Sequence, residues 1–383
     1  MCGIVGYVGS KSATPILLEG LQRLEYRGYD SAGIAVLSGE GELQVHKAAG
    51  KLSNLRSAVG TLEPPGSLGI GHTRWATHGR PSDDNAHPHT DCQGDITVVH
   101  NGIIENYAEL RDELLAKGHT FRSETDTEVL AHLIEDALPH AASLANAVRQ
   151  TLRRVTGSYS VVVVSRQHPR HMIGARQNGP LIVGLGEDEN FLASDIPAIL
   201  QHTRSIVVLD EGEVAEVTPN SVTITDLAGN PITRAPLHVD WDAEAAEKGG
   251  FPHFFTKEIH EQPQALSRAL LGRIVDDPEG PALKLDALEQ LAATGALDTV
   301  RRVTIIGCGT ALHTGMIARY AIERWARLPV EVAVASEYRY ADPIVGPETL
   351  CIALTQSGET ADTLAATRLA REMGAPVIAI TNT

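Results

Sequence analysis

The sequence contains few cysteines and no long apolar run. Its four cysteines, Cys2, Cys92, Cys308 and Cys351, form no Cys-x-x-Cys pair, which excludes a disulfide framework and favours the reducing cytoplasm. Apolar stretches such as 161–164 are only as long as a strand, and the N-terminus lacks a basic segment followed by an apolar one. We therefore expect neither a membrane span nor a signal peptide.

Basic residues are scarce as well. The 32 lysines and arginines stand against 48 acidic residues, which gives a net charge of −16 and disfavours nucleic acid or an anionic membrane as the main partner. Of the 383 residues, 43% are apolar and 21% are charged, as in ordinary globular proteins. A chain of this length has room for two domains, each with its own core.

The first 225 residues predict an α+β fold of sheets covered by helices. Short β-rich runs bounded by glycine or polar residues predict strands at 4–8, 33–37, 68–72, 96–100, 159–165, 181–185, 206–210 and 222–225. Amphipathic spacing predicts helices at about 14–24, capped by Thr14, and at about 105–117 and 127–138. Groups of strands with few helices between them disfavour a doubly wound parallel sheet.

The pattern changes near residue 240. Residues 242–250 are acidic and rich in alanine, which is typical of an exposed connector. Strands predicted at 303–306, 330–335, 350–354 and 377–380 then alternate with helices at 314–326 and 361–373, which indicates an α/β domain with a parallel sheet. This sheet would end in an uncovered edge, so we expect the second domain to be incomplete at its C-terminus. The predicted domains are 1–225 and 291–383, joined by a connector at 226–290.

Cys2 is the first candidate for chemistry. If Met1 is removed, Cys2 carries both a thiol and the free α-amine, whose reference pKa values are about 8.5 and about 8. The amine can then accept the thiol proton, which is a recognised way to activate a nucleophile. Position 2 also suits any small residue that permits removal of the methionine, so Cys2 alone does not decide the function.

An enzyme that attacks an amide with Cys2 also needs an oxyanion stabiliser. Asn101 and Gly102 follow a predicted strand, and the Asn101 side-chain amide and the Gly102 N–H could donate to a developing oxyanion. Asn-Gly is also the commonest turn dipeptide, so a simple turn is the alternative.

Candidates for a substrate clamp follow in the same region. Arg74 can bind a carboxylate through two parallel hydrogen bonds, although a structural ion pair would use it equally well. Trp75 can exclude water, while Thr77 and His78 add polar contacts. Asp126 begins a predicted helix, where it either caps the helix or holds a substrate ammonium group.

His87, His89, Asp91 and Cys92 lie close together in the sequence, and their side chains are of the kinds that bind zinc. The His-Pro-His spacing differs from that of the usual structural zinc sites, and no second pair of ligands follows at a recognisable distance. We therefore predict no metal.

Two loops of the second domain favour an anionic ligand. Residues 307–310 and 355–360 each follow a predicted strand and open a helix, whose N-terminus attracts a phosphate. The first loop is not a dinucleotide fingerprint, because the third glycine would fall on Leu312. A sugar phosphate is the natural ligand, and an ordinary capped turn is the alternative.

Six motifs in the first domain carry a family resemblance. They lie at 2–6, 25–33, 72–79, 85–89, 100–105 and 123–128. Together they resemble the class II glutamine amidotransferase domain, most closely that of the glutamine–fructose-6-phosphate aminotransferase (isomerising) family. The resemblance implies an N-terminal-nucleophile hydrolase fold, an αββα sandwich of two stacked antiparallel sheets between helix layers.

The same resemblance implies roles for the candidate residues. Cys2 would be the nucleophile, with Asn101 and Gly102 forming the oxyanion hole. Arg74 and Asp126 would hold the carboxylate and the amine of glutamine.

Further residues take supporting roles by the same resemblance. Thr77 and His78 would line the glutamine pocket, and Arg27 would support the region around the N-terminus. Trp75 resembles the gate of an ammonia channel, and His87 would pack near the active site.

The second domain resembles the sugar isomerase (SIS) fold, and residues 254–263 resemble the entry into it. Residues implied to surround fructose 6-phosphate are Cys308, Gly309, Thr310, Thr355, Gln356, Ser357 and Thr360. The chain departs from the family at Ala311 and Thr355, where serine is usual, and Ala311 lacks the hydroxyl that could donate to the phosphate.

The resemblance implies a two-site enzyme without a cofactor. L-glutamine would supply ammonia to fructose 6-phosphate, giving glucosamine 6-phosphate, and the full-length protein would form a homodimer through its SIS domains. The family carries a second SIS domain, so we expect this chain to show glutaminase activity only. The alternatives are a non-catalytic sugar-phosphate sensor and a glutaminase that serves another acceptor.

Overall fold

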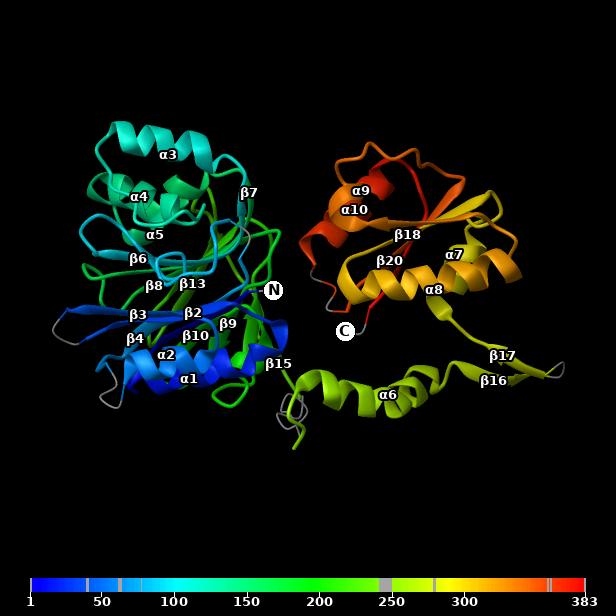
Figure 1. Ribbon diagram of the computed structural model, residues 1–383, viewed down its shortest axis with the longest axis horizontal. Helices are drawn as coiled ribbons and strands as arrows, with labels where there is room; N and C mark the ends of the chain where they lie inside the picture. The colour runs from blue at the N-terminus through cyan, green and yellow to red at the C-terminus, as the bar shows by residue number, and fades with distance from the viewer. Residues whose placement is uncertain are drawn as a thin grey trace. The chain divides into compact units, whose positions relative to one another are not determined.

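The computed structural model describes the chain apart from residues 1, 39–40, 61–63, 77, 241–249, 278–279, 357, 359 and 382–383. The chain divides into two compact units, Met1–Gly250 and Phe251–Thr383 (Figure 1). In the part of the chain that the structure describes, no helix is long and apolar enough to cross a membrane.

The first unit contains two antiparallel sheets. The first sheet has the order β15 (Leu237–His238), β11 (Ser205–Val208), β9 (Ile182–Leu185), β10 (Asn190–Ala193), β1 (Gly3–Val8), β4 (Leu68–Arg74), β2 (Ser31–Leu37) and β3 (Leu43–Ala49). The second has the order β14 (Pro231–Ile232), β13 (Val222–Asp226), β12 (Glu213–Val217), β8 (Met172–Gln177), β7 (Gly157–Ser165), β6 (Ile96–Ile104) and β5 (His89–Thr90).

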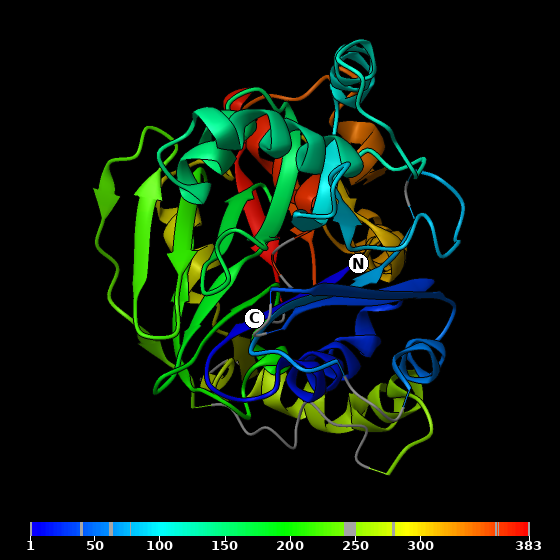
Figure 2. The same ribbon diagram turned by 90° about the vertical axis from the view of Figure 1, so that its left-hand side faces the viewer.

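Helices cover the outer face of each sheet. Helices α1 (Ala13–Arg23) and α2 (Leu52–Val59) pack on the first sheet, whereas α3 (Tyr107–Ala116), α4 (Glu128–Ala137) and α5 (Leu144–Leu152) lie on the side of the second. Figures 1 and 2 show the four layers of this unit, with the blue helices on one side and the cyan and green helices on the other. The predicted αββα sandwich is confirmed.

The alternation of side chains along β1 shows how the layers are held together. Val5 and Tyr7 are fully buried in the core beneath α1, whereas Ile4 and Val8 are buried in the core between the two sheets. Because successive side chains of a strand point to opposite faces, a strand covered on both faces is apolar at every position. Cys2, directly before β1, is thereby placed at the end of a central and fully buried strand.

The second unit contains the parallel sheet that the sequence predicts. Its order is β19 (Val330–Val334), β18 (Arg302–Gly307), β20 (Thr349–Leu354) and β21 (Val377–Ile380), and all three pairings are parallel. The helices of this sheet are α8 (Gly309–Trp325), α9 (Ala335–Tyr338) and α10 (Ala361–Glu372). Before it lie α6 (Phe254–Leu270), the hairpin β16 (Ile274–Asp277) to β17 (Gly280–Leu283), and α7 (Asp286–Ala293).

Two helix caps differ from those predicted. The N-cap of α1 is Ser12, while the Thr14 hydroxyl donates to the Pro64 carbonyl at 2.9 Å. The N-cap of α4 is Thr127, and Asp126 lies one residue earlier. In both places the side chain predicted to cap the helix instead forms a hydrogen bond with a residue distant in the sequence: Thr14 with Pro64, and Asp126 with Ile104.

The region assigned to the connector holds regular structure. Strands β14 and β15, within residues 226–250, pair with β13 and β11 and extend the two sheets of the first unit. Helix α6 includes Pro263 in its interior.

Candidate active site

The thiol of Cys2 lies against the backbone that follows β4. The Trp75 N–H donates to the Cys2 Sγ at 3.1 Å, and the Trp75 carbonyl oxygen lies 3.6 Å from the same sulfur. Antiparallel pairing of β1 with β4, which sets Gly3 opposite Thr73, brings these residues together. A segment more than 70 residues away in sequence therefore forms one wall of the site.

The pKa of the Cys2 thiol shows what activation it needs. Burial raises this pKa, while the Trp75 N–H and the nearby Arg74 charge act in the opposite direction and do not cancel the effect. The resting sulfur is therefore protonated at neutral pH. A nucleophile in this state needs a base beside it.

Asn101 contacts the backbone of Cys2 and is held in place by His72. The Asn101 Nδ2 donates to the Cys2 carbonyl at 3.2 Å, and its Oδ1 lies 2.8 Å from the His72 Nε2. The same Nε2 lies 3.1 Å from the His100 carbonyl, so both of its partners are acceptors and it must carry the proton. Burial lowers the pKa of His72 to about 3, so the ring stays neutral. A neutral His72 that donates from Nε2 turns the amide nitrogen of Asn101 towards Cys2.

Gly102 occupies a place that no other residue fits. Its φ is 138°, and a Cβ added there would lie 2.0 Å from the Ser158 carbonyl oxygen. Strand β6 continues through both Asn101 and Gly102 to Ile104, paired with β7, instead of ending in a turn after His100. The alternative of a strand-ending turn at this dipeptide is excluded, because pairing with β7 carries the strand onward.

Arg74 is buried and only partly paired. Its Nη2 donates to the His78 carbonyl and, at 3.1 Å, to the Gly79 carbonyl. Its Nη1 is also buried, yet among the described residues it has no hydrogen-bond partner. A buried guanidinium N–H without an acceptor is costly unless a ligand supplies one, and a carboxylate matches the guanidinium geometry.

Asp126 is buried near Arg74. Its Oδ2 accepts a hydrogen bond from the Ile104 N–H at 2.8 Å, and the side chain is 4% exposed. The negative charges of Asp126 and Asp30 oppose the effect of burial on Arg74, whose pKa is lowered on balance. The two predicted clamp residues are thus within electrostatic reach of each other, and Arg74 is within reach of Cys2.

Arg27 supports the backbone of the first strand. It pairs with Asp195 at 2.7 Å, and it donates to the carbonyls of Cys2 at 3.4 Å and Ser194 at 3.2 Å. Burial opposes its charge, but the neighbouring Asp195 carboxylate outweighs that effect and raises its pKa. Arg27 therefore stays charged and holds the carbonyl of the residue that bears the nucleophile.

The other predicted residues of this region differ in how far they are buried and in what they contact. Trp75 is 56% exposed, and the His78 ring packs edge-on against Tyr107 at 5.3 Å. His87 stacks on His72 at 4.1 Å, behind Asn101. Thr77 lies outside the described residues.

The two loops of the second unit meet at one edge of its sheet. Strands β18 and β20 are neighbours and parallel, so Cys308 and Thr355, which follow them, lie at the same edge. The Thr363 hydroxyl of α10 lies 4.0 Å from the Cys308 sulfur, and the hydroxyls of Thr355 and Thr360 are 3.5 Å apart.

Helices α8 and α10 begin at these loops, so their N-terminal N–H groups face the same region. Gly309, with a φ of 56°, and Thr310 form the first turn of α8, and Gln356 is exposed in the second loop. Ser357 lies outside the described residues.

Sequence reasoning missed two residues that shape the first site. His72 orients Asn101, and the Asp30 carboxylate accepts from the Ala76 N–H at 2.6 Å and so fixes the segment after Arg74. Both lie inside motifs that the sequence singled out, but neither shows its partner until the strands are paired.

The comparisons with known proteins agree with this arrangement. Residues 72–201 match the model of the glutamine amidotransferase domain, and residues 296–383 match that of the SIS domain. Over its whole length the chain is 53% identical to the protein of Symbiobacterium thermophilum named glutamine–fructose-6-phosphate aminotransferase [isomerizing]. It is 54% identical to the protein of the same name from Thermus thermophilus. The chain is a homologue of these aminotransferases.

The homology covers all of this chain and part of the relatives. The chain spans 62% of the Symbiobacterium protein and 61% of the Thermus protein. Among solved structures, the glutamine phosphoribosylpyrophosphate amidotransferase of B. subtilis aligns with a TM-score of 0.53 and 19% identity, over 100% of this chain and 82% of its own. At that identity the likeness concerns the fold alone, and it agrees with the αββα sandwich of the first unit.

Proposed function

We propose that this glutamine amidotransferase homologue hydrolyses L-glutamine with Cys2 as the nucleophile, and that the ammonia passes to fructose 6-phosphate where a second SIS domain completes the sugar site. The observation that carries the first step is the convergence of Cys2, Arg74 and Asn101, which come from three distant segments. The buried and unpaired Nη1 of Arg74 supports a carboxylate ligand beside the thiol. The homology to aminotransferases named for glutamine and fructose 6-phosphate supports both substrates.

The glutaminase step follows from these groups. The Cys2 sulfur adds to the side-chain carbonyl carbon of glutamine, and the oxyanion receives hydrogen bonds from the Asn101 Nδ2 and the Gly102 N–H. The C–N bond then breaks as the nitrogen takes a proton, which releases ammonia and leaves a thioester on Cys2. Water cleaves the thioester to glutamate and restores the thiol.

The proton in this step requires a base close to the sulfur. Because burial keeps the thiol protonated, we propose that removal of Met1 exposes the α-amine of Cys2, which accepts the thiol proton and later returns it to the leaving nitrogen. Arg74 and Asp126 would hold the substrate carboxylate and ammonium. His78 and Thr77 would line the pocket.

The sugar site is proposed for the second unit. The loops at 307–310 and 355–360 present hydroxyls and helix N-termini to a phosphate, and the residues that would surround it are Cys308, Gly309, Thr310, Thr355, Gln356, Ser357 and Thr360. Ammonia would attack the ketone carbon of fructose 6-phosphate, and isomerisation would give glucosamine 6-phosphate. Trp75 would gate the passage of ammonia, which must stay dry because protonated ammonia is not a nucleophile.

The proposal also covers the localisation, the cofactor requirement and the oligomeric state of the protein. We propose a cytoplasmic enzyme that works without a cofactor and forms a homodimer through its SIS domains, as the family resemblance implies. The net charge of −16 supports small-molecule substrates over nucleic acid or an anionic membrane.

Ammonia release from glutamine in the absence of sugar tests the glutaminase step. We expect the 383-residue chain to release ammonia and Cys2→Ala to release none above background. Cys351→Ala, a change in β20 of the second unit, is the matched control and should retain activity. A wild-type chain that binds a sugar phosphate but releases no ammonia would contradict the proposal and support a sensor.

A further inference from the structure

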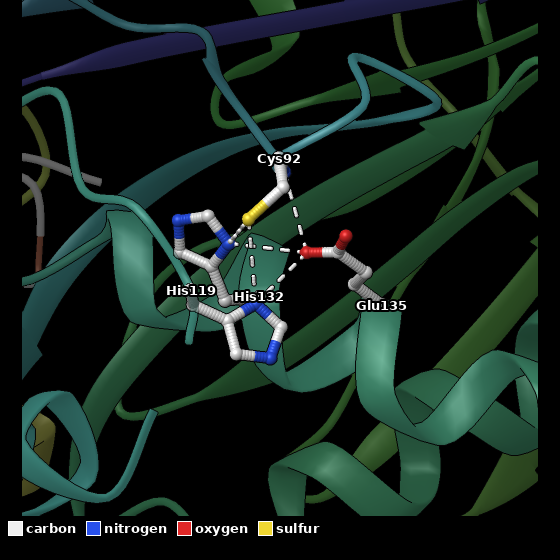
Figure 3. A group of neighbouring side chains, drawn as sticks. All are labelled: Cys92, His119, His132 and Glu135. Atoms are coloured by element: carbon white, nitrogen blue, oxygen red, sulfur yellow. Dashed lines mark hydrogen bonds and ion pairs between the residues drawn. The ribbon is translucent and has the colours of Figure 1, made fainter. Parts of the chain in front are cut away.

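A second group of reactive side chains lies in the layer of α3 and α4 (Figure 3). Cys92 follows β5, His119 lies between α3 and α4, and His132 and Glu135 project from α4. Positions three apart share one face of a helix, so His132 and Glu135 point the same way. One ligand atom from each of the four residues lies within 4.8 Å of the others.

Four of the six distances between these atoms are close to those around a tetrahedral ion. The Cys92 Sγ lies 3.5 Å from the Nδ1 of His119 and 3.5 Å from the Nδ1 of His132. The Glu135 Oε2 lies 3.0 Å and 3.2 Å from the same two nitrogens. Zinc bonds of about 2.3 Å to sulfur and about 2.0–2.2 Å to nitrogen and oxygen imply tetrahedron edges of about 3.3–3.6 Å. These four edges need to change by only a few tenths of an ångström, and the atoms of the other two pairs lie within 4.8 Å of each other.

The outer nitrogens of the two histidines face carboxylates. The His119 Nε2 lies 2.8 Å from the Asp136 Oδ1, and the His132 Nε2 lies 3.6 Å from the Glu128 Oε1. A neutral His119 that donates Nε2–H to Asp136 turns the lone pair of its Nδ1 towards Glu135, which also offers a lone pair. Two acceptors that face one another need either a proton or a metal ion between them. Carboxylates behind metal-binding histidines are also the usual outer shell of zinc sites.

We propose that Cys92, His119, His132 and Glu135 bind one zinc ion in a closed, structural site. The ligands would be the Cys92 thiolate, the two Nδ1 atoms and one Glu135 oxygen. The thiolate and the carboxylate balance the 2+ charge, and a mixed sulfur, imidazole and carboxylate set arranged tetrahedrally suits zinc better than magnesium or calcium. This site is independent of the proposed glutaminase activity.

The site differs from the arrangement weighed in the sequence. Of the residues considered there, only Cys92 takes part, and His87 packs against His72 and His89. The partners of Cys92 come from 27 to 43 residues further along the chain. Neither a Cys-x-x-Cys nor a His-x-x-x-His pair marks them, so sequence spacing led us to predict no metal.

A zinc ion here would join three segments of the first unit. It would link the loop after β5, the segment that leads into α4, and α4 itself. That segment carries Asp126, and Glu128 accepts from the backbone N–H groups of Arg122 and Ser123 at 2.7 Å each. The ion would therefore stabilise the part of the backbone that positions Asp126.

Metal analysis of the whole chain tests the proposal. The 383-residue chain is loaded with Zn²⁺, freed of loose ion by gel filtration and assayed for zinc, and we expect about one equivalent per chain. Replacement of the zinc by Co²⁺ should give the intense visible bands of a tetrahedral site and a thiolate-to-cobalt band in the near ultraviolet. Less than a tenth of an equivalent of zinc, or Co²⁺ bands of an octahedral aqua type, would overturn the proposal.

Variants separate this site from adventitious binding. Cys92→Ser should abolish the thiolate-to-cobalt band, whereas Cys351→Ala should leave it unchanged. Asp136→Asn, which changes the carboxylate behind His119 and its ion pair with Lys117, should weaken zinc binding by about 10–100-fold, while the exposed Asp112→Asn on α3 should not. If Cys92→Ser folds and keeps the charge-transfer band, or Asp136→Asn binds zinc as tightly as the wild type, the assignment fails.

Discussion

The hydrogen bond from His72 to Asn101 gives the proposed oxyanion hole its direction. Without it, the Asn101 amide could present its oxygen to the site, where an oxyanion would be repelled. His72 is fully buried and donates from Nε2, and no acceptor lies at its Nδ1 among the described residues, which agrees with an unprotonated Nδ1 and a neutral ring. His72 is thus a positioning residue, and Asn101 is the group that would contact the reacting atoms.

Replacement of Asn101 should lower turnover more than substrate binding. We expect Asn101→Leu to reduce the kcat of glutamine hydrolysis by about 10²–10³-fold, because a donor to the oxyanion acts mainly in the transition state. KM should change little. Steady-state ammonia release measures both constants, and Asn54→Ala in α2 serves as the control. A rise in KM with kcat unchanged would show that Asn101 binds the ground state instead.

The burial of neutral His72 should be visible in the stability of the protein at mildly acidic pH. The pKa of His72 is about 3 in the folded chain and about 6.5 when unfolded, so between these values only the unfolded state binds the proton. Folding stability therefore rises with pH in this window and falls by about 1.4 kcal/mol for each pH unit below about 6.5.

Substitution of His72 isolates this contribution. The difference in unfolding free energy between the wild type and His72→Gln should shrink by about 1.4 kcal/mol per unit as pH falls from 6.5 to 5. Urea unfolding at a series of pH values measures it, with His140→Gln at an exposed site as the control. A difference that does not change with pH would mean that His72 binds a proton as readily in the folded chain as in the unfolded chain.

At the scale of elements, the close approach of β6 and β7 makes Gly102 irreplaceable. Gly102→Ala should destabilise the first unit by several times the cost of Gly118→Ala, where φ is 94° and nothing lies within 4 Å of an added Cβ. The cost at Gly118 should be about 1–2 kcal/mol, since only the left-handed backbone opposes the methyl group. Thermal and urea unfolding of both variants would measure this, and equal losses would contradict the packing described.

Most elements of both units could be predicted from apolar periodicity, including the four parallel strands and the helix pair α3 and α4. What could not be predicted depends on long-range partners. Strand β6 runs past Asn101 because β7 pairs with it, and Asp126 leaves the cap of α4 because the Ile104 N–H binds it. Strands β3, β5, β8, β10, β12 and β14 to β17 and helices α2, α5, α6, α7 and α9 were not predicted.

In the candidate site, too, some residues could be predicted from local sequence and others depend on long-range partners. Cys2, Arg74 and Asn101 could be proposed from the motifs, and the structure brings them together. His72, Asp30 and the four residues around Cys92 could not, because their roles depend on which segments the fold brings together.

At the scale of the whole molecule, the two compact units should respond to different ligands. We expect glutamate, a product of the first unit, to raise the unfolding temperature of that unit, and fructose 6-phosphate to raise that of the second. Saturation at about 100 times Kd adds about 2.7 kcal/mol to the unit that binds. Calorimetry with intrinsic tryptophan fluorescence separates the two transitions, and a single transition shifted equally by both ligands would contradict independent sites.

The central claim is that a thiol and an α-amine on Cys2 together attack glutamine. Its most direct test is to treat the chain with a diazoketone analogue of glutamine and map the modified peptide by mass spectrometry. We predict one label, on the sulfur of Cys2, in an N-terminal peptide that has lost Met1. A label on another residue, or a fully active chain that retains Met1, would contradict the account.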